Sequence, residues 1–169
     1  MAVTFRTIAC AVALAATASL GPAQAQQSQA RKWCVASEAD GVSLDLKISG
    51  CTTLIESGKE SKDNLANAFS NRGSAYRAKG EYDRAIQDFN QAIELNPSDA
   101  VAFSGRGVVY SAKGQPDRAI QDFDQAIKLN PSDAMAFYNR GIAKANMGDK
   151  EGADADLAAA RRIIPNIRR

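Results

Sequence analysis

The 169-residue chain contains no histidine. This absence excludes histidine general bases, Ser-His and Cys-His nucleophile pairs and histidine metal sites, and with them most familiar hydrolases and metalloenzymes. The chain also lacks a strong charge of either sign, because 21 Lys and Arg residues face 19 Asp and Glu residues and leave a formal charge of +2. We therefore expect no nucleic-acid partner. No phosphate-binding loop, metal-ligand cluster or catalytic carboxylate pair occurs in a supporting context, so we predict that the protein is not an enzyme and needs no cofactor and no metal.

Proline is scarce, with 5 residues, whereas the 12 glycines are ordinary and 45% of the residues are hydrophobic. This composition is that of one ordinary globular domain and leaves no room for two large ones.

Residues 1–25 are typical of a secretory signal peptide. Arg6 precedes an uncharged run at residues 7–20, the Gly-Pro pair at 21–22 is expected to break any helix, and Ala25 has the small side chain of a cleavage site. We predict cleavage after Ala25, a periplasmic or secreted location and no membrane insertion after cleavage. The alternative is an uncleaved membrane anchor, which requires about 18 or more apolar residues.

Only two cysteines remain beyond the predicted cleavage site, Cys34 and Cys51. An oxidising compartment favours a disulfide between them. Their spacing differs from the C-x-x-C of redox-active sites, so we predict a structural cross-link that stabilises the fold by about 3 kcal/mol. The alternative is a thiol-disulfide redox role for the pair.

A repeat of 34 residues covers most of the rest of the chain. Residues 66–99 and 100–133 are identical at 25 of 34 positions, and residues 134–167 keep ten identities with the second copy. The apolar residues within each copy are spaced as on helices. We predict two antiparallel helices per copy, joined at Gly80, Gly114 and Gly148, with Asn-Pro-Ser-Asp ending the first two copies.

The repeat resembles the tetratricopeptide repeat (TPR) over about 100 residues. The shared pattern is an aromatic residue at unit position 4, Gly at 8, Tyr at 11, Ala at 20, Phe at 24, Ala at 27 and Pro at 32. In the second copy these are Phe103, Gly107, Tyr110, Ala119, Phe123, Ala126 and Pro131. The resemblance implies an all-α, right-handed superhelical solenoid of three helix-turn-helix units within residues 63–169.

Each unit departs from the family pattern by carrying an arginine where an aliphatic residue is usual. An aspartate follows each arginine sixteen residues later, as in Arg106 and Asp122. We propose an ion pair between the two helices of every unit; the alternative is that both side chains face water. The other two pairs are Arg72 with Asp88 and Arg140 with Asp156.

Residues 26–62 are predicted to form a helical cap on the array. Residues 43–57 follow the pattern of a second helix, with Cys51 in the place of the phenylalanine. Residues 30–39 are expected to form a short partner helix, fastened by the disulfide, in which Trp33 is a packing residue. At the other end, Asp154 and Arg161 replace the apolar residues of earlier units and provide a polar stop.

The family resemblance implies that the first helices of successive units line a concave groove for an extended or helical segment of a partner protein. By position, the groove residues are Asn67, Ser70, Asn71, Ser74, Arg77, Val101, Ser104, Gly105, Val108, Ser111, Met135, Tyr138, Asn139, Ile142 and Ala145. The set begins polar and ends apolar, so we expect its C-terminal part to bind one or two hydrophobic anchors. The alternative is that the chain's own tail covers this part.

Some members of the family clamp a peptide's terminal carboxylate with lysine and arginine in this groove. The corresponding positions here are Ser70, Ser74, Gly105, Met135 and Asn139, which does not support that activity. We therefore predict a non-enzymatic adaptor or scaffold whose partner is another protein. The alternatives are the redox role and a self-assembling structural protein, in which the partner is a second copy of the chain.

Overall fold

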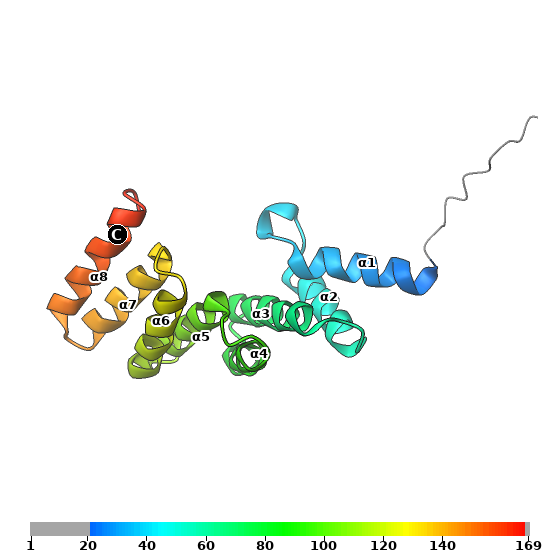
Figure 1. Ribbon diagram of the computed structural model, residues 1–169, viewed down its shortest axis with the longest axis horizontal. Coiled ribbons are helices and arrows are strands. Elements are labelled where there is room, and N and C mark those ends of the chain that lie inside the picture. Colours follow the sequence, from blue (N-terminus) through cyan, green and yellow to red (C-terminus); the bar gives the residue numbers. More distant parts are fainter. Residues whose placement is uncertain (1–20, 168–169) are drawn as a thin grey trace, which may run out of the picture.

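A computed structural model of the protein describes residues 21–167, which form eight α-helices and one short 3₁₀ helix and contain no strand (Figure 1). The helices are α1 (Pro22–Val35), α2 (Leu44–Glu56), α3 (Lys62–Ala78), α4 (Tyr82–Leu95), α5 (Ala100–Ala112), α6 (Pro116–Leu129), α7 (Ala134–Asn146) and α8 (Lys150–Ile163), with the 3₁₀ helix at Glu38–Asp40. The predicted all-α solenoid is confirmed. The apolar run of the predicted signal peptide, at residues 7–20, lies outside the described residues.

Consecutive helices pair into four antiparallel hairpins that follow one another along a crescent (Figure 1). The first helices α1, α3, α5 and α7 also contact one another in order. Within residues 21–167 the second helices α2, α4, α6 and α8 make no such contacts among themselves. The first helices therefore converge on the inner side of the curve and the second helices diverge on the outer side.

The helix ends follow from local sequence. Asp99 and Asp133 accept hydrogen bonds from the first free backbone N–H groups of α5 and α7. The three turns inside the repeats contain Gly80, Gly114 and Gly148 at φ of 76°, 70° and 88°, a conformation in which a side chain would be strained. The predicted turns are confirmed.

Helix α1 differs from the sequence expectation at both ends. Gly21 is the non-helical N-cap of α1 and Pro22 occupies the first helical position, where a missing N–H costs nothing. The predicted break of a helix by this Gly-Pro pair concerns residues before 21, which lie outside the described residues. The predicted cleavage site after Ala25 therefore lies in the first turn of α1. The predicted partner helix covered residues 30–39, whereas α1 begins earlier, at Pro22, and also ends earlier, at Val35.

Close packing between hairpins depends on residues without a side chain. The ring of Phe89 on α4 is fully buried between Gly73 on α3 and Gly105 on α5. A methyl group on Gly105 would lie 2.6 Å from Cζ of Phe89, which leaves no room for it. Gly105 therefore provides space for the aromatic residue of the preceding hairpin.

The three predicted ion pairs are present. Arg106 on α5 donates from Nε and Nη2 to the two carboxylate oxygens of Asp122 on α6, at 2.9 and 2.7 Å. Arg72 with Asp88 and Arg140 with Asp156 repeat this bidentate geometry. The aspartates are only 4–5% exposed, so the alternative in which both partners face water is wrong.

The third nitrogen of each arginine joins a neighbouring hairpin. Nη1 of Arg106 donates to Asn90 on α4 at 2.6 Å, and Nη1 of Arg140 donates to Asp124 on α6 at 2.6 Å. Arg72 makes the same contact with Thr52 on α2 at 2.9 Å. Each arginine thus ties together three helices, and α2 takes the place of a second repeat helix. Thirty-four residues after Asp124 the chain has Ala158, which offers no acceptor for a further arginine.

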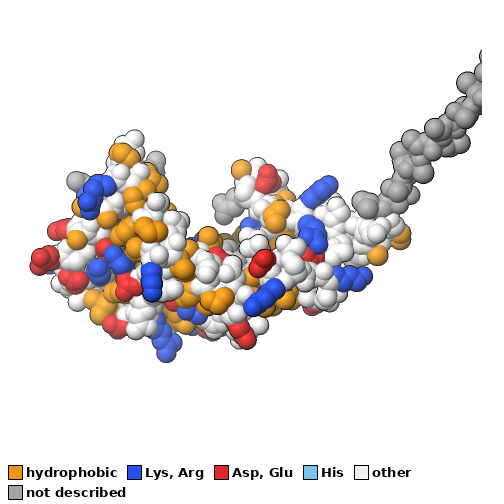
Figure 2. Space-filling model, in the orientation of Figure 1, with side chains coloured by type: hydrophobic (Ala, Val, Ile, Leu, Met, Phe, Trp, Pro, Cys, Tyr) orange, Lys and Arg blue, Asp and Glu red, His pale blue; other side chains and the backbone are white. Residues whose placement is uncertain are grey.

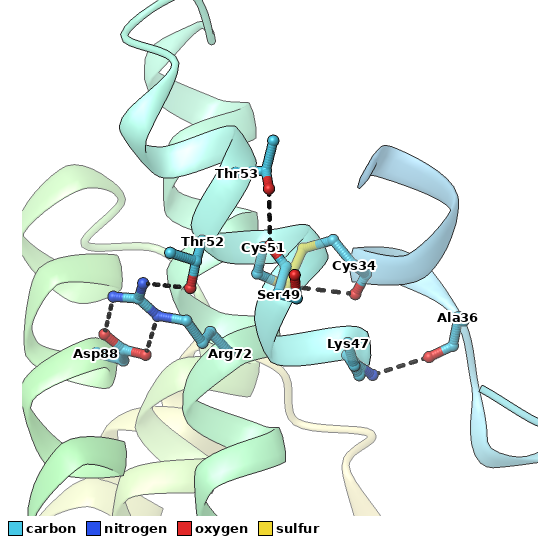
Figure 3. Close-up of a disulfide and its surroundings, with 9 residues drawn as sticks. All are labelled: Cys34, Ala36, Lys47, Ser49, Cys51, Thr52, Thr53, Arg72 and Asp88. Carbon is cyan, nitrogen blue, oxygen red and sulfur yellow. Dashed lines mark hydrogen bonds and ion pairs between the residues drawn. A yellow bond between two sulfur atoms is a disulfide. The ribbon is translucent and has the colours of Figure 1, made fainter. Parts of the chain in front are cut away.

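A disulfide joins α1 to α2, with the sulfur atoms of Cys34 and Cys51 2.11 Å apart (Figure 3). The two cysteines are 1% and 0% exposed. Around them Ala30, Leu54 and Ala68 form a small hydrophobic cluster. Trp33 packs beside Gly50, where an added methyl group would approach its Cβ to 2.8 Å. The buried residues of α1 are Ala30 and Cys34 alone, so the cross-link supplies much of what holds this helix.

None of the helices in residues 21–167 combines the length and the apolar character needed to cross a bilayer.

We predict that Arg106→Leu lowers the free energy of unfolding by about 3 kcal/mol, because it leaves the buried carboxylate of Asp122 without its partner. The double variant Arg106→Leu, Asp122→Leu should recover most of this loss, since it removes both charges. Urea unfolding followed by circular dichroism measures both values. A single variant as stable as the parent would contradict the structural role of the pair.

The last pair should show a specific pH dependence. Burial raises the pKa of Asp156, but the hydrogen bonds and charges of Arg140 and Lys144 outweigh it and hold the pKa below its ordinary value. A lowered folded-state pKa stabilises the protein fully above the unfolded value and progressively less as the pH falls through the folded value. The stability difference between the parent and Asp156→Asn should therefore stay constant down to about pH 5 and shrink as the pH falls from there to about pH 2. A difference that stays constant across this range would contradict the assignment.

The double variant Cys34→Ala, Cys51→Ala should lose about 3 kcal/mol of stability, and the loss should be local to α1. Hydrogen exchange measured by mass spectrometry should show fast exchange over residues 22–35 and unchanged protection over residues 100–129. Equal protection of α1 in the variant and the parent would show that packing alone holds the helix.

Candidate functional site

The inner side of the crescent contains a groove of about 270 Å³ lined by three first helices. Figure 2 shows a hollow above α3 and α5, between the two ends of the molecule. The groove is lined by Ser74 and Arg77 on α3, by Val101, Ser104, Gly105 and Val108 on α5, by the α7 cap Asp133, and by Met135 and Asn139 on α7. We call this site the central groove.

Apolar side chains in the central groove are unusually exposed. Val101 is 67% exposed and Met135 is 50% exposed, and half-buried Val108 lies beside them. Both exposed residues lie in the first turn of their helices, at equivalent positions of two successive repeats. No part of the chain within residues 21–167 covers them. They form a hydrophobic strip across α5 and α7.

Two charged side chains line the central groove, and they differ in their partners. Asp133 accepts hydrogen bonds from the backbone N–H groups of Met135 at 2.9 Å and Ala136 at 3.1 Å, so its charge is engaged by the N-terminus of α7. The side chain of Arg77 is exposed near the end of α3 and makes no hydrogen bond or ion pair with any described residue.

A second hollow of about 180 Å³ continues the inner side toward the N-terminus, between α1 and α3. We call it the N-terminal groove. Asn67 and Asn71 on α3 face Val35 on α1 across an apolar floor that includes Leu54. Val35 is 69% exposed. Helix α1 is therefore both a cap on the array and one wall of its inner surface.

Buried Glu60, in the connection between α2 and α3, holds the wall of the N-terminal groove in place. Its side chain is 1% exposed and accepts from Arg31 at 2.7 Å, Gln27 at 3.0 Å and Asn64 at 3.2 Å. Two of these donors lie on α1 and one on α3. The carboxylate thus connects both sides of the groove, and its charge is compensated by Arg31.

The structure places some of the predicted groove residues in the central groove, some in the N-terminal groove and the rest in neither. Eight line the central groove, and Asn67 and Asn71 line the N-terminal groove. Ser111, Tyr138, Ile142 and Ala145 line neither. Ser70 is a correction: it is only 7% exposed, because it shares the packed stripe of α3 with Ala66 and Gly73, four residues before and three after it.

Sequence reasoning did not identify the groove residues that α1 and α2 contribute. Arg31, Val35 and Leu54 lie outside the 34-residue repeat, so no positional alignment reaches them. The available signal was that residues 43–57 follow the pattern of a second helix. A second helix implies a preceding first helix, and such a helix lines the groove.

The chemistry available in these two grooves is that of binding. Within the part of the chain that the structure describes, no group of three His, Cys, Asp or Glu residues is placed to hold a metal ion. The groove side chains are hydroxyls, amides, aliphatic groups, the Met135 thioether and four charged groups, of which only the guanidinium of Arg77 has no partner among residues 21–167. The disulfide lies beside the N-terminal groove but is buried, which is unfavourable for thiol exchange because the attacking thiolate must reach a sulfur atom.

Comparisons with known proteins agree with the fold. A model of the TPR repeat matches residues 73–114, and a model of the tetratricopeptide repeat matches residues 100–133. No curated protein sequence matches the chain.

Three solved structures illustrate the similarity. The second TPR of Spaghetti (RPAP3), bound to HSP90 peptide SRMEEVD, is 28% identical with a TM-score of 0.57, over 58% of this chain and 91% of that one. MamA is 22% identical with a TM-score of 0.69, over 84% of this chain and 78% of that one. YrrB, described as a TPR protein with an unusual peptide-binding site, is 23% identical with a TM-score of 0.67, over 86% and 70%.

The family models match within the helical hairpins that share the 34-residue period, and these hairpins stack as those of the similar structures do. Residues 73–133 match tetratricopeptide repeats, and the fold of the described residues is similar to that of solved TPR proteins.

Proposed function

We propose that this protein is a non-enzymatic adaptor that binds a segment of a partner protein in the central groove. The hydrophobic strip binds one or two apolar side chains of the segment, and the polar side chains beside it bind the segment's backbone. The N-terminal groove extends the same surface and binds the continuation of the segment.

The observation that carries this proposal is the exposure of Val101 and Met135 on the inner side of a curved array. Apolar side chains in a concave, partly enclosed site gain free energy when a ligand removes them from water. Asn139 lies in the same groove, and its amide can donate to a carbonyl and accept from an N–H of an extended backbone. The site therefore offers an anchor for a side chain and partners for a main chain.

The similar structures support a protein partner. The TPR of Spaghetti is bound to a peptide of another protein, and YrrB is described by its peptide-binding site. For this chain we propose the same class of ligand, a peptide segment, without the terminal carboxylate clamp that the sequence does not support.

We further propose that the adaptor acts outside the cytoplasm, in the periplasm or as a secreted protein. This proposal rests on the signal-peptide pattern of residues 1–25 and on the disulfide, which an oxidising compartment preserves.

Selection from a display library of random linear peptides tests the adaptor function. We expect binders whose affinity falls about tenfold or more in the double variant Val101→Ser, Met135→Ser, because each substitution removes about 1 kcal/mol of apolar contact. Fluorescence polarisation with the selected peptides gives the affinities.

The matched control is Leu46→Ser, Met147→Ser, which removes two exposed apolar residues that line neither groove. It should leave the affinities unchanged. Peptides that bind both double variants as tightly as the parent would exclude the central groove as the site.

A further inference from the structure

The central groove presents one full charge whose side chain makes no hydrogen bond or ion pair with any described residue. Of the four charged side chains that line the two grooves, Arg31 and Glu60 form an ion pair at 2.7 Å. Asp133 is bonded to two backbone N–H groups at the start of α7, where the partial positive charge of the helix end offsets it. Arg77 has no partner among residues 21–167.

The position of Arg77 joins this charge to the hydrophobic strip. Arg77 lies on α3 and lines the same groove as Val101 on α5 and Met135 on α7. A segment seated on the strip therefore passes close to the guanidinium. Because such a segment displaces water from the groove, it also lowers the local dielectric and strengthens the interaction between Arg77 and any charge that the segment carries.

Resting on the proposed function, we propose that the bound segment carries an acidic side chain close to its apolar anchor and that Arg77 pairs with that carboxylate. A planar guanidinium binds a carboxylate through two parallel hydrogen bonds, which fixes the direction as well as the position of the segment. The acidic residue lies toward α3 and the apolar anchor lies toward α5 and α7. A basic residue at the same place is repelled.

The carboxylate belongs to an internal side chain of the partner. A single arginine on one wall suits one carboxylate group, whereas capture of a chain end requires several donors around it. The positions at which such donors would stand are Ser74, Gly105, Met135 and Asn139 within the groove, none of them cationic, and buried Ser70. Blocking the end of the peptide should therefore not affect binding.

The charge preference is tested with the peptides that the library selection yields, prepared with acetylated and amidated ends. In each peptide the residues beside the apolar anchor are replaced in turn by Glu, Gln and Lys. At one position we expect affinity to fall about fivefold from Glu to Gln and further to Lys, as for a partly exposed ion pair. In Arg77→Glu the order of these three affinities should be reversed. In Arg77→Lys the order should be kept, with a smaller difference between the Glu and Lys peptides.

Arg161→Glu is the matched control, because Arg161 is exposed on α8 and lines neither groove. The substitution changes the net charge by the same amount as Arg77→Glu. This variant should bind the Glu, Gln and Lys peptides in the same order of affinity as the parent. Thermal unfolding of each variant separates ligand binding by Arg77 from stabilisation of the C-terminus of α3. A residue that only stabilises the helix end would change the melting temperature when replaced and leave the order of peptide affinities unchanged.

The outcomes distinguish the two proposals. Peptides whose binding depends on Val101 and Met135 but is equal for Glu, Gln and Lys would overturn the role of Arg77 and leave the adaptor function standing. The same order of affinities for the Glu, Gln and Lys peptides in the parent and in Arg77→Glu would also overturn the role of Arg77 and leave the adaptor function standing. A library without any peptide that depends on Val101 and Met135 would overturn the proposed function and this inference with it.

Discussion

The bidentate pair between an arginine of a first helix and the aspartate of its second helix is the interaction on which the array depends. The aspartate is almost completely buried, and a buried carboxylate without a partner is strongly destabilising. The two parallel hydrogen bonds therefore hold the helices of a hairpin at one orientation. Because Nη1 of the same arginine bonds to the second helix of the preceding hairpin, as in Arg106 with Asn90, one side chain also sets the orientation between hairpins.

The groove is a consequence of that repeated orientation. First helices contact one another and second helices do not, so the stack of hairpins curves and leaves the first helices on the inner side. Phe89 fits between hairpins because Gly73 and Gly105 leave room for its ring, which allows α3, α4 and α5 to approach closely. The first-turn residues Val101 and Met135 are left outside this packing and remain exposed on the inner surface.

The N-terminal hairpin follows the same plan with different chemistry. Thr52 accepts the hydrogen bond that Asn90 and Asp124 accept elsewhere, so α2 joins the ladder of arginines. Helix α1 has no arginine-aspartate pair to hold it, and its buried surface is small. The disulfide and the tether of Glu60 replace that pair, and they place Val35 opposite Asn67 across the N-terminal groove.

The sequence by itself determined the repeating part of the protein. A period of 34 residues with helical spacing is sufficient to predict the hairpins and the turns at Gly80, Gly114 and Gly148. It also proposed the arginine-aspartate pairs, but only the structure decided between pairing and exposure to water. These contacts connect positions at constant separations within a unit, so the same residue types recur at the same spacing in each copy. The pairing of Cys34 with Cys51 followed from the scarcity of cysteine.

The tertiary structure alone decided which residues form the site. It buried Ser70, which position in the repeat had assigned to the groove, and it added Val35 and Leu54, which belong to no repeat. It also left the side chain of Arg77 without a partner among residues 21–167 while it engaged Asp133 in a helix cap. The reason is that a repeat pattern specifies contacts common to all units, whereas the groove is built from the positions at which the units differ and from a helix outside the period, and their neighbours are set only when the hairpins pack.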